Sequence, residues 1–380
     1  MSKTLIGQFA EGPDLALLAD SVRAFVADKT DHRRTRALRQ SELGYDPGLL
    51  RSMAELGWTG ILLPPSSGGL GLGFGAMACA IKELGRGLMA EPIAASVVLA
   101  GQVLALADNE DIAGRLLPQL VAGERMPALA WQEKADGGDA LVPDAARTTA
   151  EPAQGGARIS GRKRWVAGGS DGFIVSAHGP DGLALYWLEA DAPGLALKSQ
   201  RQADGTPLRD LVLDGAFATM VASPAIAGDV IGRTVDAAAA MACAEMCGIA
   251  EFAMEVTLDY MRTRVQYGKA IGSFQALQHK AVDLYVQHEL ALSATLDAVN
   301  ALDARVGAAE RAREVSRAKA RCSEAAVRIT REAIQLHGAI GFTEQHDIGL
   351  YLKRALVLAA FCGNAEAHRR RHVNLTLDGR

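Results

Sequence analysis

The spacing of apolar residues changes twice along the chain, and this limits the fold more than any other feature. Residues 1–122 repeat apolar positions at helical spacing, as Leu15, Leu18 and Val22 do. Residues 123–230 instead contain short β-rich runs separated by turn signals, and residues 231–380 return to long helical segments. The sequence therefore predicts an α+β chain of three domains with these bounds.

The two later domains have distinct predicted architectures. In the middle domain, the runs Phe173–Ala177, Leu185–Leu188 and Leu211–Leu213 have the spacing of a compact antiparallel barrel or sandwich. In the last domain, Phe274, Leu277, Ala281 and Leu284 fall on one helical face, a second apolar stripe runs from Val315 to Leu336, and breakers are few. Long helices with few breakers predict an antiparallel four-helix bundle, a fold that commonly carries an oligomer interface.

Composition excludes several classes of partner. The net charge of -4 and the pI near 6.1 provide no general basic field, so neither nucleic acid nor an anionic membrane is an expected partner. The five cysteines are scattered without a Cys-x-x-Cys pair, so we expect neither a disulfide framework nor a metal site. The apolar stretch at residues 93–107 is shorter than the ~18 residues of a membrane span. We expect a soluble, cytoplasmic protein.

Two motifs in the last domain carry the functional signal. Arg264–Lys269 and the following Ile271–Gln275 place a fixed cation and two glycines just before a long helix, and Gln335–Phe342 lies far downstream. A guanidinium forms forked, permanently charged hydrogen bonds, which suit an anionic pyrophosphate. Together these stretches resemble the flavin-binding signature of the acyl-CoA dehydrogenase family.

The resemblance covers nearly the whole chain, because that family also has a helical, then β, then helical domain order. It implies an FAD-dependent α,β-desaturation of an acyl-CoA thioester. In that reaction a base removes an α-proton while a hydride leaves the β-carbon for the flavin. It also implies an oligomer, typically a tetramer, and an electron-transfer flavoprotein or similar acceptor.

The resemblance also implies the residues that contact FAD. In the bundle domain these are Arg264, Gln266, Tyr267, Gln275, Gln335, His337 and Gly338, and in the β domain Trp165 packs on the flavin ring. Each has a structural alternative. Arg264 could form a surface salt bridge, Gln335–Gly338 a helix C-cap, and Trp165 a buried barrel residue.

The β-domain contacts depart from the family pattern. Relatives read Thr-Glu-Pro-x-x-Gly-Ser-Asp where this chain has Gln132–Asp139, which replaces a hydroxyl donor, a proline and a serine. Ala167 stands where a threonine normally bonds the flavin ring. We therefore expect fewer hydrogen bonds from this chain to the ring.

Both family positions for the catalytic base are vacant. Where relatives carry Tyr-Glu-Gly-Thr, this chain reads Phe361–Asn364, so Cys362 replaces the glutamate, and the alternative position is Ala238. A thiol with a pKa of ~8.5 is a poor substitute for a carboxylate, so we interpret Cys362 as a small buried residue. Glu245 is a weak candidate because it lies ~10.5 Å along the helix from Ala238. A structural ion pair is its favoured role.

This combination is similar to the small, non-catalytic subunit of heteromeric pimeloyl-CoA and sterol-CoA dehydrogenases. The resemblance implies that the chain lends Arg264, Gln275, Gln335 and Gly338 to the FAD of a partner that supplies the base. Two alternatives remain at this point. One is a self-sufficient homotetrameric dehydrogenase that uses Glu245, and the other is a cofactor-free scaffold or acyl-CoA-binding protein.

Overall fold

The computed structural model describes residues 13–142 and 146–377, which form two compact units. The bundle unit comprises the described parts of Met1–Ala37, Phe74–Met89 and Ala239–Arg380, and the sheet unit comprises Leu38–Gly73 and Ala90–Ala238. Helices of the predicted N-terminal domain contribute to both units. The predicted α+β class, with helices, a central sheet and C-terminal helices, is confirmed.

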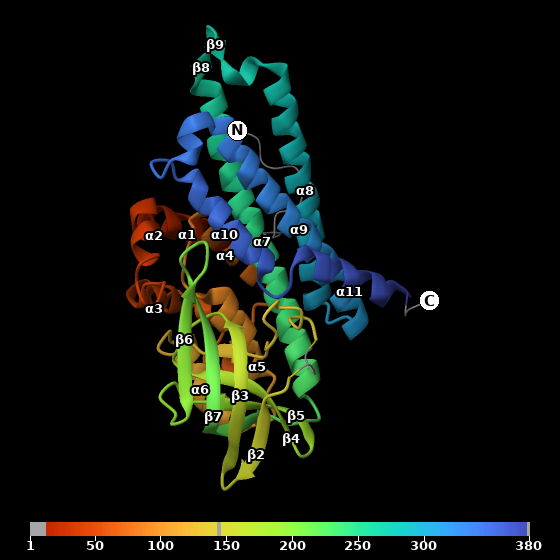
Figure 1. Cartoon of the computed structure of the whole chain (residues 1–380). Helices are drawn as coiled ribbons and strands as arrows, with labels where there is room; N and C mark the ends of the chain where they lie inside the picture. The colour runs from red at the N-terminus through yellow and green to blue at the C-terminus, as the bar shows by residue number, and fades with distance from the viewer. Residues whose placement is uncertain (1–12, 143–145, 378–380) are drawn as a thin grey trace. The chain divides into compact units, whose positions relative to one another are not determined.

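The bundle unit is built from long helices, several of which run alongside one another in Figure 1. The hairpin strands β8 (Val265–Gln266) and β9 (Lys269–Ala270) lie between the helix that ends at Thr263 and the helix that begins at Gln275. The helices are α1 (Pro13–Lys29), α2 (His32–Leu38), α4 (Phe74–Arg86), α7 (Ala227–Thr263), α8 (Gln275–Asp303), α9 (Ala308–His337), α10 (Ile348–Ala360) and α11 (Ala365–Leu377).

Helix α9 shows why this sequence forms a bundle. Its predicted apolar stripe is buried, and it packs against α8, α10 and α11. The buried stripe consists of Val315, Ala318, Cys322, Ala325, Ile329, Ala333 and Leu336. In helix α7, residues Ala237–Ala244 are buried on every side of the helix, as expected of a core helix. Its length and hydropathy would suit a membrane span, as would those of segment Ile348–Leu377, but 89% of the α7 window is buried inside the protein.

Two glycines allow α4 and α7 to touch backbone to backbone. A Cβ atom on Gly85 would lie 2.6 Å from the carbonyl oxygen of Glu245, and one on Gly248 would lie 1.9 Å from the carbonyl oxygen of Lys82. No side chain fits at such distances. This contact ties an N-terminal helix to the C-terminal bundle.

His288 and His368 are buried in the bundle in their neutral form. Burial lowers the pKa of His288 on α8 to about 4 and that of His368 on α11 to about 3. The His368 Nε2–H donates to the Cys362 carbonyl at 2.9 Å, because a carbonyl oxygen can only accept. Its Nδ1 lies 3.2 Å from the Ser316 hydroxyl, which can then donate to it.

The sheet unit is a seven-stranded barrel with helices around it. Its strands are β1 (Ala128–Ala130), β2 (Thr149–Ala153), β3 (Gly156–Val166), β4 (Phe173–Gly179), β5 (Gly182–Leu188), β6 (Leu195–Arg201) and β7 (Pro207–Ala222). The order β4-β2-β3-β7-β5 closes into a ring because β5 pairs with both β7 and β4. The pairings are antiparallel except for β1 and β2 with β4, which are parallel and were not anticipated.

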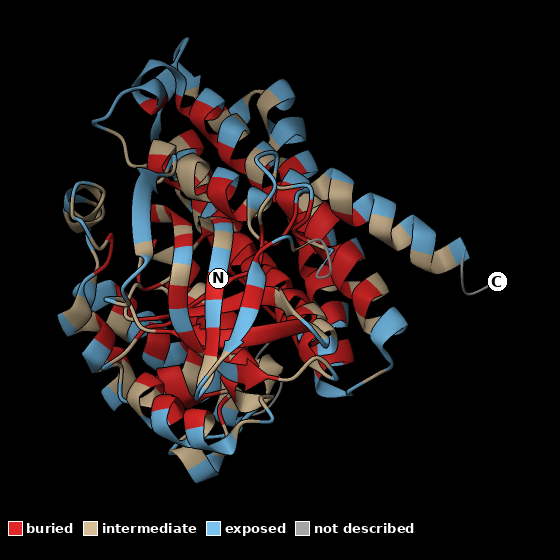
Figure 2. Ribbon diagram, turned by 60° about the horizontal axis from the view of Figure 1, so that its bottom comes forward, coloured by how far each residue is buried: buried red, intermediate tan, exposed pale blue. Residues whose placement is uncertain are grey.

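The barrel encloses its own apolar core. Buried and exposed residues alternate along strands such as β3, as Figure 2 shows, because successive side chains point to opposite faces. The core includes Ile159, Phe173, Val175, Tyr186 and Leu211. The remaining elements of this unit are α3 (Pro47–Glu55), η1 (Trp58–Gly60), η2 (Pro65–Ser67), η3 (Ile93–Ala100), α5 (Gly101–Ala105) and α6 (Glu110–Val121).

The α4–α7 contact predicts a large difference between two alanine substitutions in α7. Gly248→Ala forces its methyl group into the Lys82 carbonyl, so we expect a loss of about 1–3 kcal/mol in the free energy of unfolding. Gly232→Ala adds a methyl group with no heavy atom within 4 Å and should stabilise the helix by about 0.5–1 kcal/mol. Denaturant unfolding of both variants measures this difference, and equal stabilities would contradict the contact.

The buried histidines predict acid sensitivity. In the unfolded chain these histidines bind protons below a pKa of ~6.5, whereas in the folded chain His288 and His368 bind them only below about pH 4 and pH 3. Between these values the unfolded chain binds more protons, so the free energy of unfolding falls as the pH falls from 7.5. At pH 5.5 each histidine should cost about 1.4 kcal/mol.

The His368→Gln variant, which does not titrate, should lose less stability between pH 7.5 and pH 5.5 than the unaltered chain. The exposed His279→Gln variant should keep the unaltered pH dependence. Urea unfolding at the two pH values tests this, and identical pH dependence in all three proteins would refute the role of His368.

Candidate functional site

Four of the predicted cofactor residues lie exposed at one end of the bundle unit, around the β8–β9 hairpin. They are Arg264, Gln266, Tyr267 and Gln275. The Tyr267 side chain is 94% exposed, and its backbone φ of 51° is the left-handed conformation that a tight hairpin requires. An exposed aromatic ring on a constrained turn is available to an incoming surface.

Arg264 is held in place by its main chain while its guanidinium remains available. Its N–H donates to the Tyr260 carbonyl and its own carbonyl accepts from Ile271 N–H, both at 2.8 Å. No carboxylate in the part of the chain that the structure describes forms an ion pair with its side chain. Its neighbour Arg262, by contrast, pairs with Asp259 at 2.6 Å. Within residues 13–142 and 146–377, the salt-bridge alternative for Arg264 is therefore not realised.

The second motif lies beside the first because two aromatic rings stack. His337, the last residue of α9, stacks on Tyr260 of α7 with a centroid distance of 4.6 Å. Its Nδ1–H donates to the Ala333 carbonyl at 2.8 Å, and burial lowers its pKa. The side chain of His337 thus packs inside the bundle, whereas the sequence resemblance assigned it to the cofactor.

Gln335 and Gly338 flank this histidine and are exposed. Gly338 has a φ of +66°, its N–H donates to the Gln335 carbonyl, and α9 ends there, so the C-cap alternative describes the local backbone correctly. A C-cap and a ligand contact are compatible, because the Gln335 amide still faces solvent.

In the sheet unit, Trp165 meets the Gln132–Asp139 loop. Its indole Nε1–H donates to the Lys134 carbonyl at 2.8 Å. The residue is only half-buried and has a φ of 58°, at a β-bulge between Lys163 and Val166 where β3 pairs with β7. A bulge re-aims a side chain, and here it turns the tryptophan away from the barrel core.

The sequence analysis missed a buried ion pair beneath this loop. The Lys163 Nζ donates to Glu133 Oε1 at 2.6 Å and to Ser176 Oγ at 2.9 Å, and Glu133 also accepts from Thr148. Burial lowers the pKa of Lys163 to about 8. Burial opposes ionisation of Glu133, yet Lys163 and the hydrogen bonds leave the pKa of Glu133 lowered. Strand parity with Ile159 could have placed Lys163 inside the barrel.

Cys362 lies buried in the turn between α10 and α11, with a φ of 55°. The buried side chains of Lys319 and His368 hold this turn by hydrogen bonds to its carbonyls. Lys319 Nζ donates to the carbonyls of Ala359 at 3.1 Å and Gly363 at 2.9 Å, and His368 donates to the carbonyl of Cys362 itself. Burial lowers the pKa of Lys319. The geometry agrees with Cys362 as a small buried residue.

Glu245 is buried and pairs with Arg354 at a distance of 2.6 Å between Oε1 and Nε. This is the structural ion pair that the sequence favoured over a catalytic role. Ala238, at the other base position, is also buried. Among the described residues, no cluster of histidine, cysteine, aspartate or glutamate side chains is arranged to hold a metal ion.

The residues at the hairpin end of the bundle fit an anionic dinucleotide such as FAD. Arg264 offers an available guanidinium, and Gln275 and Gln335 offer exposed amides that can donate and accept. A diphosphate needs such a cation, and an adenosine needs such amides. No residue in this set is a proton acceptor suited to acyl-CoA chemistry.

Comparison with known proteins follows this pattern. The profile described as "Acyl-CoA dehydrogenase, N-terminal domain" matches residues 12–124, and that described as "Acyl-CoA dehydrogenase, C-terminal domain" matches residues 228–373. Acyl-CoA dehydrogenase IpdE2 from Mycobacterium tuberculosis is 30% identical over 342 residues, which cover 89% of this chain and 90% of the relative.

Solved structures agree along the whole chain. The Tcur3481-Tcur3483 steroid ACAD variant matches with a TM-score of 0.86 and 30% identity, over 96% of this chain and 98% of that one. The ChsE4-ChsE5 complex from Mycobacterium tuberculosis shares the fold with a TM-score of 0.87 and 24% identity, over 98% of this chain and 99% of that one. This chain belongs to the acyl-CoA dehydrogenase family of flavoprotein oxidoreductases, which act on the CH–CH bond of acyl-CoA thioesters.

Proposed function

We propose that this chain is the supporting subunit of a heteromeric, FAD-dependent acyl-CoA dehydrogenase. Its Arg264, Gln275, Gln335 and Gly338 contact an FAD that is shared with a second, related chain. That second chain supplies the contacts to the flavin ring and the catalytic base. The observation that carries the proposal is the available, exposed guanidinium of Arg264 in a chain with no carboxylate at either base position.

The vacant base positions argue against independent catalysis. Cys362 is buried in a turn whose carbonyls are bonded to His368 and Lys319, so a shift that would expose its thiol breaks those bonds. Glu245 is buried and held by Arg354 in an ion pair, so its carboxylate is not free to reach a substrate. The proton therefore has to be removed by the partner.

The division of labour follows from the side chains. Bound FAD supplies the hydride acceptor. Arg264 neutralises the pyrophosphate with forked hydrogen bonds, and the amides of Gln275 and Gln335 orient the nucleotide end. Each group needs only to be rigid and exposed, and the hairpin and the Tyr260–His337 stack provide the rigidity.

The names of two similar proteins support assembly with a second chain. One is described as a ChsE4-ChsE5 complex and the other as a Tcur3481-Tcur3483 steroid ACAD, so each name joins two components. For this chain we propose the same general arrangement, in a cytoplasmic tetramer that oxidises an acyl-CoA and passes electrons to an electron-transfer flavoprotein or similar acceptor.

Removal of one guanidinium tests the proposal. In the complex with an acyl-CoA dehydrogenase-like partner chain, Arg264→Ala should lower FAD affinity about 10- to 100-fold, because a charged hydrogen bond is worth about 1.5–3 kcal/mol. Flavin absorbance per complex after gel filtration measures the loss. Arg262→Ala, two residues away and paired with Asp259, is the matched control and should retain flavin. Full flavin retention in Arg264→Ala would overturn the proposal.

A further inference from the structure

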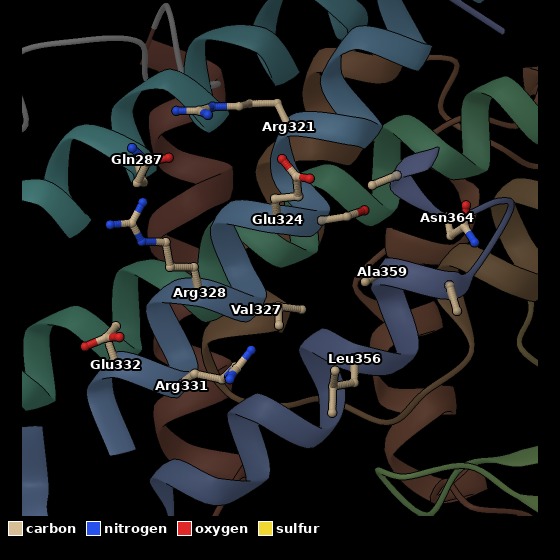
Figure 3. A pocket seen from close by; sticks show the side chains of 13 residues that line it. Gln287, Arg321, Glu324, Val327, Arg328, Arg331, Glu332, Leu356, Ala359 and Asn364 are labelled. Carbon is tan, nitrogen blue, oxygen red and sulfur yellow. The ribbon is translucent and has the colours of Figure 1, made fainter. Parts of the chain in front are cut away.

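A groove on the bundle unit, about 800 Å³ in volume, lies between α9 and α10 and extends to α8 and the start of α11. Figure 3 shows its lining from close by. The groove is bordered by three arginines of α9, namely Arg321, Arg328 and Arg331, and by apolar or small residues that include Val327, Leu356 and Ala359. It shares none of the predicted cofactor residues, and its last arginine, Arg331, lies one helical turn before Gln335 on α9.

The charge on this groove is uncompensated. Its two glutamates are already neutralised, because Glu324 pairs with Arg369 and Glu332 pairs with Lys280 at 3.0 Å. Among the described residues, no carboxylate forms an ion pair with Arg321, Arg328 or Arg331. The lining therefore has three positive charges without a carboxylate partner among the described residues.

The arginines form a line along the helix. Arg321 and Arg331 are ten residues apart, which corresponds to ~15 Å at 1.5 Å per residue, or nearly three helical turns. In Figure 3, Arg328 reaches toward Gln287 on α8, whereas Arg331 reaches toward the α10 side, where Leu356 lies. Because the guanidiniums point in different directions, they do not converge on a single phosphate group.

The apolar side of the groove favours a polypeptide. Leu356 on α10 is 45% exposed, and Leu290, one helical turn from Gln287 on α8, is 50% exposed. Large exposed side chains of this kind beside a hollow are expected to be covered in an assembly. Ala359 and Ala360 have small side chains, so a helix can approach the α10 side of the groove closely.

We propose that this groove receives an acidic amphipathic helix of the partner subunit. Its apolar face covers Val327 and Leu356, and its carboxylates pair with Arg321, Arg328 and Arg331. Complementary charge along ~15 Å fixes the register of the two subunits and accelerates their encounter. The inference rests on the proposed function, because it places one contact of the heteromer.

The test uses the charge-reversed double variant Arg328→Glu/Arg331→Glu and the acyl-CoA dehydrogenase-like partner chain. We expect the variant to bind the partner roughly 10- to 100-fold more weakly at 50 mM NaCl, with a smaller difference at 500 mM NaCl because salt screens exposed charges. Arg305→Glu, an exposed arginine before α9, is the matched control and should bind normally. Far-UV circular dichroism checks that each variant folds, and Arg328→Gln/Arg331→Gln should give an intermediate effect.

The outcomes separate the two ideas. The groove assignment is overturned if the charge-reversed variant binds the partner with unchanged affinity, or if the groove is occupied by a second copy of this chain alone. In either case, a yellow complex would still support the proposed function. Weakened binding in a complex that holds no flavin supports the groove and overturns the flavin-lending role. Absence of any complex with the unaltered chain overturns both.

Discussion

The stack of Tyr260 on His337 is the contact on which the candidate site depends. It joins the end of α7 to the end of α9, and so brings together two motifs that lie about seventy residues apart in sequence. Because His337 packs inward, Gln335 and Gly338 on either side of it remain exposed near the Arg264 hairpin. The stack joins the two motifs, and the His337 side chain itself is buried in the bundle.

The turn that carries Cys362 is held by structural contacts, at the position where the family resemblance would place a catalytic glutamate. A base must reach substrate, whereas here the main chain around Cys362 is bonded to two buried groups, Lys319 and His368. Burial disfavours the charged form of both side chains and so lowers the pKa of each. The contacts that hold this turn therefore depend on pH. Glu245 also has a structural contact, because its carboxylate forms an ion pair with Arg354.

Much of the architecture could be predicted, because it depends on local period. The α9 stripe and the runs that became β4, β5 and β7 follow directly from apolar spacing. The closure of the barrel, the parallel pairing of β1 with β4 and the Glu133–Lys163 pair depend on partners distant in sequence. The exposed arginines of the α9 groove were invisible for a similar reason, since a sequence does not show which charges find partners. The burial of His337 also required the fold.

The visible absorption spectrum of the purified chain tests the supporting-subunit role most directly. We predict a colourless protein when the chain is alone, and a yellow one with about one flavin per pair when it is combined with its partner chain. A yellow protein with about one flavin per chain in the absence of a partner, bleached by a saturated acyl-CoA, would contradict it.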